Sequence, residues 1–246
     1  SDELPVPEAT SFASSGVGAL SNHEPRPVPP TPVDYDGILA AVSGMPLVGN
    51  DDGNIPAFGV YLTRHYANYY NRVSFEFLRQ LESSYGEEGR TAAEGLLLEA
   101  GRVCAFNTFG GIMTSTEWDA LIRPALKSDE DWVHGMVAVA NALGWGRWQV
   151  TSVSSDAAEF VLHDDYESVG YLAEYGKAPH PVSYLAQGGV EGLMTLVYVA
   201  RIMDRPTLDP AFYDKTFRAS THFEATSLSS RAMGDDVTSF RVSRKG

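Results

Sequence analysis

Aromatic side chains are the chemical feature that stands out in this sequence. They gather between residues 61 and 148, several beside glycine or methionine: Tyr61, Tyr66, Tyr69, Tyr70, Phe75, Phe106, Phe109, Trp118, Trp132, Trp145 and Trp148. Aromatic rings with an adaptable methionine nearby, such as Met113 or Met136, suit a pocket for a flat apolar molecule. A few hydroxyl or imidazole groups would then orient that molecule. Taken singly, most of these residues would equally suit an ordinary hydrophobic core.

Acid–base chemistry would depend on histidine. His65 lies among the tyrosines and His134 lies within a predicted helix, but neither stands in the sequence context of a catalytic triad. If the protein is an enzyme, we expect a cofactor-independent acid–base reaction in which His65 or His134 works with a tyrosine.

The remaining reactive side chains carry weaker signals. Cys104, the single cysteine, falls on the apolar stripe of a predicted helix, where we expect a buried, inert thiol. The run His163-Asp164-Asp165, with Glu167, contains metal-ligating residue types. Successive side chains of a strand point to opposite faces, so we interpret this run as a polar strand end and predict no bound metal.

Two glycine clusters were compared with nucleotide-binding motifs. Gly86-Glu87-Glu88-Gly89 and the stretch from Gly188 to Gly192 match neither the dinucleotide fingerprint nor the phosphate-binding loop. We therefore expect no nucleotide and no other cofactor.

Four helices are predicted between residues 72 and 144. Apolar spacing predicts helices over residues 72–85 and from about 90 to 106, separated by a break at Gly86–Gly89. Thr114 with Glu117, and Ser128 with Asp131, are typical capping boxes for two further helices, which end near Leu126 and Gly144.

Strands and one long helix follow. Alternating apolar and polar residues predict a strand hairpin over residues 147–163. Apolar residues at three- and four-residue spacing then predict a helix over 182–203, in which Gly188, Gly189 and Gly192 allow another backbone to approach closely. A second strand pair is predicted over 217–225 and 237–242, joined through a turn at Met233–Asp236. This order favours an α+β fold with a mainly antiparallel sheet of two hairpins covered by helices.

Three short motifs carry a resemblance to a known family. They are Gly144-Trp145-Gly146, Pro181-Val182-Ser183-Tyr184 before the glycine-rich helix, and Gly234-Asp235 with Phe240. In their order and spacing, over roughly residues 70–243, the chain resembles the 4-vinyl-reductase-type domain, a family of bacterial binders of small hydrophobic or aromatic molecules. The family includes the sensor domains of aromatic-responsive NtrC-type activators, and TRAPP vesicle-tethering subunits share its fold.

The resemblance implies a fold similar to the NO-signalling and Golgi-transport ligand-binding domains, a homodimer, and a ligand held between a helix and the strands after it. The ligand-binding positions that it implies are Trp132, Met136, Trp145, Trp148, Phe160 and Tyr184. One departure concerns the zinc ion that family members hold through cysteines flanking the closing glycine. Ser230 and Thr238 occupy those positions, and neutral hydroxyls are poor zinc ligands, so we predict that the metal site is lost.

Charge and composition exclude some classes of protein. The net charge of −14 disfavours nucleic-acid binding, because phosphate groups would be repelled. No apolar run reaches the ~18 residues that a membrane-spanning helix needs. The chain begins Ser-Asp-Glu, without the basic and apolar regions of a signal peptide, and we expect a cytoplasmic protein.

The N-terminal segment differs from the rest. Residues 1–36 are rich in proline and are predicted to form an extended arm, followed by a single α+β domain over residues 37–246. The arm is interpreted as a solvated tail, as a strap on its own domain, or as a docking segment for a dimer partner or another protein.

Three functions remain open from the sequence alone. The preferred one is a sensor or accessory protein that binds a small hydrophobic or aromatic molecule. The second is a cofactor-independent biosynthetic enzyme acting on a polycyclic or tetrapyrrole-like substrate. The third is an assembly or adaptor protein that docks through residues 1–36.

Overall fold

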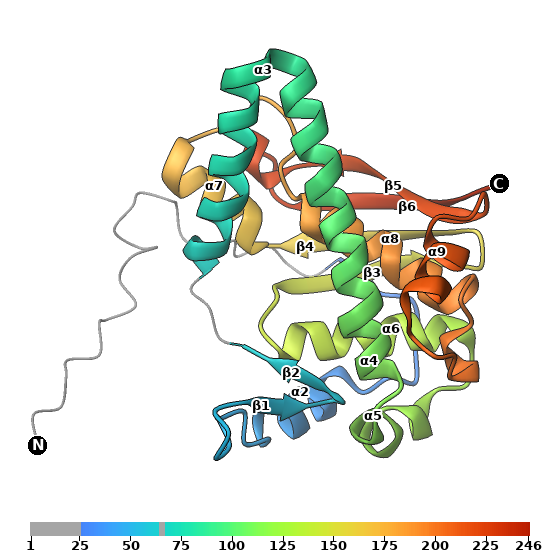
Figure 1. The fold of residues 1–246 in the computed structure, drawn as a ribbon. Coiled ribbons are helices and arrows are strands. Elements are labelled where there is room, and N and C mark those ends of the chain that lie inside the picture. Colours follow the sequence, from blue (N-terminus) through green and yellow to red (C-terminus); the bar gives the residue numbers. More distant parts are fainter. Residues whose placement is uncertain (1–25, 64–66) are drawn as a thin grey trace, which may run out of the picture.

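The computed structural model describes residues 26–63 and 67–246 (Figure 1). Its helices and strands are α2 (Tyr35–Ser43), β1 (Ile55–Ala57), β2 (Val60–Leu62), α3 (Ala67–Cys104), the π-helical turn η1 (Ala105–Phe109), α4 (Gly110–Met113), α5 (Thr116–Leu121), η2 (Arg123–Ala125), α6 (Asp129–Ala142), β3 (Arg147–Val153), β4 (Ala157–His163), α7 (Tyr166–Tyr175), α8 (Tyr184–Tyr198), η3 (Ile202–Asp204), α9 (Pro210–Phe217), β5 (His222–Ser229), η4 (Arg231–Met233) and β6 (Thr238–Lys245).

A four-stranded antiparallel sheet forms the centre of the domain. Its strand order is β3-β4-β6-β5, and the small β1–β2 hairpin forms a separate sheet. Phe160 on β4 lies opposite Val150 on β3 and Phe240 on β6, so that face presents a continuous apolar surface. Helices α6 and α8 pack against it, and both contribute buried side chains to one core. The predicted α+β fold with two hairpins is confirmed.

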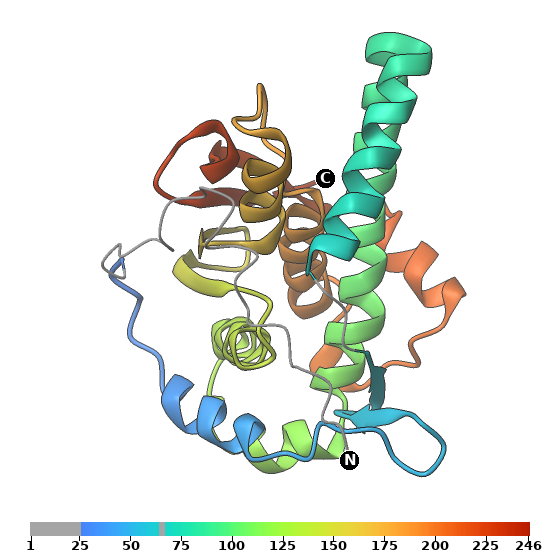
Figure 2. The same ribbon diagram turned by 90° about the vertical axis from the view of Figure 1, so that its left-hand side faces the viewer.

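Helix α3 consists of two arms. Gly86 has φ 64° and ψ −144° between them, so the predicted break at this glycine is confirmed. The second arm crosses α8 closely, and the tip of the hairpin rises beyond the rest of the molecule (Figure 2). Near the tip, Arg90 pairs with Glu94 at 2.8 Å and with Glu87 at 3.4 Å, which ties the start of the second arm together.

Glycines make the contact between α3 and α8 possible. A Cβ atom at Gly188 would clash with the carbonyl oxygen of Leu98, and one at Gly101 would lie 2.6 Å from the carbonyl oxygen of Leu185. The predicted close approach at the glycine-rich helix is therefore present, with α3 as the partner.

Several predicted boundaries were wrong. The helix predicted over residues 182–203 ends at Tyr198, and the helix predicted to end near Leu126 ends at Leu121. Residues 217–221 do not belong to a strand, because Asp209 caps α9 by accepting a hydrogen bond from the Phe212 N–H, and α9 runs on to Phe217. At α5 the capping residue is Ser115 rather than Thr114, since its hydroxyl accepts from the Trp118 N–H at 3.0 Å. The predicted capping box of Ser128 and Asp131 on α6 is confirmed.

The described part of the N-terminal arm packs on its own domain. The backbone N–H of Arg26 donates to Gln149 at 3.1 Å, the Thr31 hydroxyl donates to Asp131 at 3.0 Å, and Val33 is buried. Helix α2 then packs on α6. These contacts fit the interpretation of this part of the arm as a strap.

Candidate ligand-binding site

A buried cluster of one carboxylate and three hydroxyls joins α7, α8 and β6. Asp165 Oδ1 accepts from the Ser183 hydroxyl at 2.8 Å, and Oδ2 accepts from the Thr238 hydroxyl at 2.6 Å. The Ser168 hydroxyl lies 2.9 Å from that of Ser183 and 3.1 Å from that of Thr238. All four side chains are buried, so each satisfies the polar groups of the others. The cluster fastens the start of α7 to α8 and to the closing strand.

The two positions predicted to have lost their metal ligands lie at this cluster. Thr238 belongs to it, and Ser230 is buried at the start of the η4 turn, where its N–H donates to Asp235 at 2.8 Å. Among the residues that the structure describes, no group of three or more His, Cys, Asp and Glu side chains is placed to hold a metal ion.

Glu167 holds α7 against the first turn of α8. Its two carboxylate oxygens accept from the N–H groups of Leu185 at 3.0 Å and Ala186 at 2.9 Å, which the helix itself leaves unpaired. The side chain is almost completely buried. Burial, with a smaller contribution from the charge of Asp165, raises the pKa of Glu167 to about 8. Because Tyr166 precedes Glu167, this anchor also fixes the position of Tyr166.

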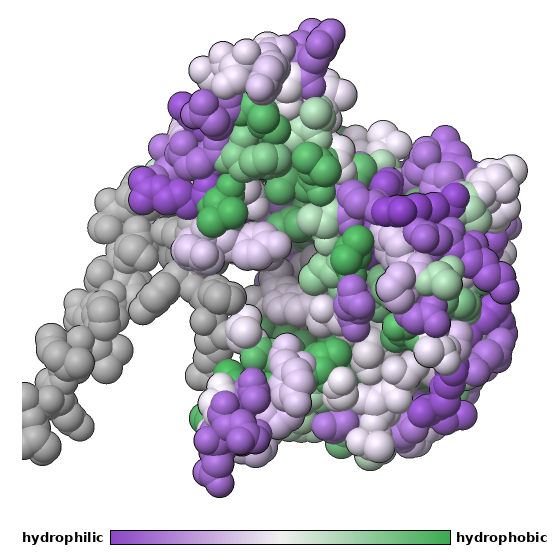
Figure 3. Space-filling view, viewed as in Figure 1, coloured by the Kyte–Doolittle hydropathy of each residue, from purple (hydrophilic) through white to green (hydrophobic). Residues whose placement is uncertain are grey.

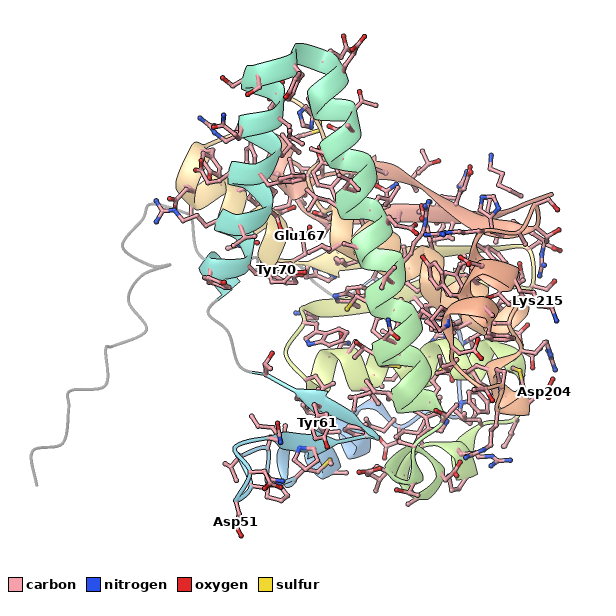
Figure 4. All side chains as sticks on the ribbon, in the orientation of Figure 1. Asp51, Tyr61, Tyr70, Glu167, Asp204 and Lys215 are labelled. Atoms are coloured by element: carbon pink, nitrogen blue, oxygen red, sulfur yellow. The ribbon has the colours of Figure 1, made fainter. Side chains whose placement is uncertain are left out.

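Tyr166 faces the start and the end of α3. Its ring lies 6.3 Å from that of Tyr70, centre to centre, with an angle of 84° between the ring planes. Tyr70 and Glu167 lie next to each other in Figure 4. Burial, and then the nearby Cys104 thiol and Glu167 carboxyl, raise the pKa of Tyr70. Two phenol groups and one thiol therefore share one neighbourhood.

Cys104 is exposed, and the predicted core position was wrong. Its helical stripe faces outward at this point, and the thiol lies 3.7 Å from the Thr108 hydroxyl. Desolvation nevertheless raises the pKa of the Cys104 thiol. The Cys104 thiol is therefore reached by solvent but surrounded by protein on most sides, which places it in a concave region of the surface. Figure 3 shows the surface hollowed between the base of α3 and the β1–β2 hairpin.

A small pocket lies beside this region. It has a volume of about 110 Å³ and is lined by Leu47, Ile55, Leu62, Thr63, Leu143 and Trp145. Trp145 stacks on Phe109, with ring centres 5.5 Å apart. The next residue, Gly146, packs on Asp165, since a Cβ at Gly146 would lie 3.9 Å from the Asp165 Cα atom. Trp145 and Tyr166 are thus each one residue away from the contact of Gly146 with Asp165, and we call the region of Tyr70, Cys104, Trp145 and Tyr166 the hollow.

The six predicted ligand-binding residues lie in different environments. Trp145 lines the pocket. Met136, Trp148 and Phe160 are buried in the main core, and Trp132 packs at its margin with its ring 5.4 Å from that of Trp118. Tyr184 belongs to a second core and donates its hydroxyl to Glu94 at 3.0 Å. Met136, Trp148 and Phe160 thus belong to the core that α6 forms with the sheet. The role of the six residues in ligand binding stays a prediction.

Of the two predicted acid–base histidines, each expected to work with a tyrosine, the structure describes His134. His134 is buried, and its Nδ1 atom lies 2.9 Å from the Tyr35 hydroxyl of α2. Burial lowers the pKa of His134, so its neutral form is favoured. His65 lies outside the described residues.

Sequence reasoning missed most of the hollow. Tyr70 was in the aromatic set without a role, and Cys104 was placed in the core. Tyr166 and Glu167 carry a usable signal: a tyrosine and an acid directly after a predicted strand, upstream of a glycine-rich helix that needs an N-terminal acceptor.

Comparisons with known proteins show a similar fold. No family model and no curated protein matches the sequence. Among solved structures, the phenol-responsive sensory domain of the transcription activator PoxR, with phenol, superposes with a TM-score of 0.61. The two are 13% identical, over 85% of this chain and 89% of that one. A trafficking protein particle complex subunit 3 from Naegleria fowleri, covalently bound to palmitic acid, gives a TM-score of 0.47 at 15% identity, over 73% and 95%.

The likeness to the first of these structures, at 13% identity, establishes that the two share a fold. Within residues 26–63 and 67–246, no helix combines the length and apolar character required to cross a membrane.

Proposed function

We propose that the protein binds a small neutral aromatic molecule in the hollow, as a sensor or accessory protein. The observation that carries the proposal is the meeting of Tyr70, Tyr166 and Cys104 in a region that solvent reaches and protein desolvates, beside a pocket lined by Trp145. The similar fold of a phenol-responsive sensory domain supports it. We further propose that the protein belongs to the 4-vinyl-reductase type, is located in the cytoplasm and forms a homodimer.

The size of the pocket limits the ligand. A cavity of about 150 Å³ holds benzene, so the pocket of about 110 Å³ must widen slightly for a single ring. The outer ends of β1 and β2, which line the pocket through Ile55 and Leu62, must supply that space, because the turn between the strands is fixed by the buried Phe58. We expect the ring of the ligand to lie against Trp145.

The expected affinity is modest. Removing about 250 Å² of apolar surface from water contributes about 6 kcal/mol before the losses of association. A hydrogen bond from the Tyr70 or Tyr166 hydroxyl would add about 1 kcal/mol and select a ligand with an acceptor oxygen or nitrogen. These contributions predict binding in the micromolar to millimolar range.

Replacing Trp145 with alanine tests the site. We expect the affinity for phenol, measured by titration calorimetry, to fall at least tenfold, because the stacking surface is lost. The Tyr166→Phe variant, which keeps the ring, should bind phenol several-fold more weakly. The matched control is Tyr61→Phe, since Tyr61 is 74% exposed on β2. Equal affinities for the wild type and the Trp145→Ala variant would refute the site.

Deletion of residues 1–25 tests the adaptor alternative. The described strap from Arg26 onward stays in place in this variant, together with its contacts to Gln149 and Asp131. A ligand-binding protein should keep its affinity for phenol, whereas an adaptor that docks through the arm should lose its protein partner. Loss of phenol binding on deletion would contradict the proposed location of the site.

A further inference from the structure

A narrow recess lies between the first arm of α3 and α7, which pack side by side (Figure 1). Its volume is about 10 Å³, the room that one water-sized group needs. Three residues from each helix line this space, which we call the recess: Asn71, Arg72, Phe75, Gly170, Glu174 and Tyr175. The pocket beside Trp145 is a different space, lined by other residues.

The side-chain amide of Asn71 brings an unused acceptor to the recess. Asn71 is 4% exposed, and its Nδ2 atom donates to the backbone carbonyl of Tyr166 at 2.7 Å. This bond fixes the orientation of the amide, because the opposite orientation would set two carbonyl oxygens against each other. The Oδ1 atom is buried and has no hydrogen-bond partner among the described residues. Buried polar atoms rarely stay unpaired, so this oxygen requires a donor from outside the described part of the chain.

Gly170 on α7 keeps the Asn71 amide in this position. A Cβ atom at Gly170 would lie 1.8 Å from the Asn71 Nδ2 atom, so any side chain there would push the amide away from Tyr166. The close approach of α7 and the first arm of α3 at this point therefore depends on the glycine. It leaves the recess with a rigid, correctly oriented acceptor.

The groups around the acceptor favour a cationic donor. The Glu174 carboxylate pairs with Arg72 at 3.2 Å, but these side chains are 43% and 70% exposed, so solvent screens the pair and it is weak. The Phe75 ring lies 6.2 Å from that of Tyr175, centre to centre, and Arg79 already lies over the Tyr175 ring at 4.6 Å. Aromatic ring faces attract cations. The net charge of −14 also concentrates cations near the surface.

We propose that the recess binds a small ammonium group, either the free ammonium ion or the end of a primary alkylamine. One N–H donates to Asn71 Oδ1 and a second donates to the Glu174 carboxylate, while the exposed Arg72 side chain turns into solvent. Water also donates to an acceptor, but it gains less than a cation from a carboxylate and from ring faces. An occupied recess ties the first arm of α3 to α7, because both helices line it.

The first experiment compares thermal unfolding in methylammonium chloride and in tetramethylammonium chloride at equal concentrations. Tetramethylammonium carries the same charge but has no N–H to donate. We expect methylammonium to raise the unfolding midpoint by about 3–6 °C at ten times its dissociation constant, and tetramethylammonium to leave it unchanged. Equal responses to the two salts would overturn the proposal. Ammonium chloride distinguishes the sources: a response to ammonium alone assigns the recess to the free ion, and a response to both assigns it to alkylamines as well.

Variants of the lining residues locate the site. Asn71→Leu removes the acceptor and should abolish the difference between the two salts. Glu174→Gln changes an exposed side chain and should weaken methylammonium binding about tenfold, even if Asn71→Leu fails to fold. The matched control is Glu88→Gln, which removes the same charge from an exposed residue at the tip of the α3 hairpin and should respond as the wild type does. A wild-type response in Glu174→Gln would place the binding elsewhere and overturn the proposal.

Crystals grown with and without methylammonium chloride identify the occupant directly. We expect density for the ammonium group in the recess, within hydrogen-bonding distance of Asn71 Oδ1 and the Glu174 carboxylate, only in the presence of the salt. Density of the same size in both crystals would show an ordered water only and would overturn the proposal.

Discussion

Alanine at Gly188 is expected to lower the free energy of unfolding by about 3 kcal/mol, because it overpacks a contact between two backbones. The added methyl group would meet the carbonyl oxygen of Leu98, and the backbone N–H of Arg102 at 2.9 Å. Neither atom can turn away as a flexible side chain does, so α3 must move off α8. Urea denaturation, monitored by circular dichroism, measures the change.

The neighbouring glycines supply the controls. A Cβ at Gly189 would lie 3.7 Å from the nearest atom, at the end of the Trp148 side chain, and a Cβ at Gly95 meets nothing within 4 Å. Gly95→Ala should stabilise the protein by about 0.5–1 kcal/mol through helix propensity, and Gly189→Ala should be close to neutral. If Gly188→Ala and Gly189→Ala had the same effect, α3 and α8 would not be in close contact.

The Glu167→Ala substitution is expected to lower the free energy of unfolding by about 3 kcal/mol. Two buried N–H groups lose their acceptor, and each such loss costs about 1–3 kcal/mol. Those groups belong to Leu185 and Ala186 in the first turn of α8. The start of α7 should also lose its anchor. We therefore expect this variant to lose phenol binding along with stability.

The pH dependence of stability gives a sharper test of Glu167. Its pKa rises from 4.5 in a solvated chain to about 8 in the fold, mainly through burial. The folded state then binds more protons between these values, so the contribution of Glu167 is complete below pH 4.5 and declines as the pH rises to 8. The slope should approach 1.4 kcal/mol per pH unit from this group alone.

The isosteric variant Glu167→Gln isolates that contribution. Its amide keeps one acceptor and cannot ionise, so its free energy of unfolding should change less between pH 5.5 and pH 8 than that of the wild type. Urea midpoints at the two pH values measure the difference. The carboxyl of Glu191, whose pKa is raised by burial, remains in both proteins and cancels in the comparison. Parallel pH profiles would show that Glu167 is ionised throughout.

Local patterns in the sequence were enough to predict most of the fold. Helical spacing and the Gly86 break predicted the α3 hairpin, alternation predicted β3 and β4, and three glycines predicted a close helix contact at α8. These features depend on residues near one another in the chain. The start of β5 was wrong for the same reason: alternation from Phe217 onward resembles a strand, but Phe217 ends α9 and residues 218–221 form bends before β5.

The candidate site could not be predicted in the same way. Its members Tyr70, Cys104 and Tyr166 come from α3 and α7, and only the packing of α3 on α7 brings them together. Cys104 shows the difficulty clearly, because an apolar stripe indicates that a helix packs against something without indicating which of its faces stays open. The six positions implied by the family resemblance include one that lines the pocket, Trp145.

A crystal structure of the protein grown with saturating phenol would test the central claim most directly. We predict electron density for one ring against Trp145, with its hydroxyl within hydrogen-bonding distance of Tyr166 or Tyr70, and a β1–β2 hairpin displaced enough to admit it. An unchanged pocket without ring density, or a ring bound elsewhere with Trp145 and Tyr166 untouched, would contradict the account.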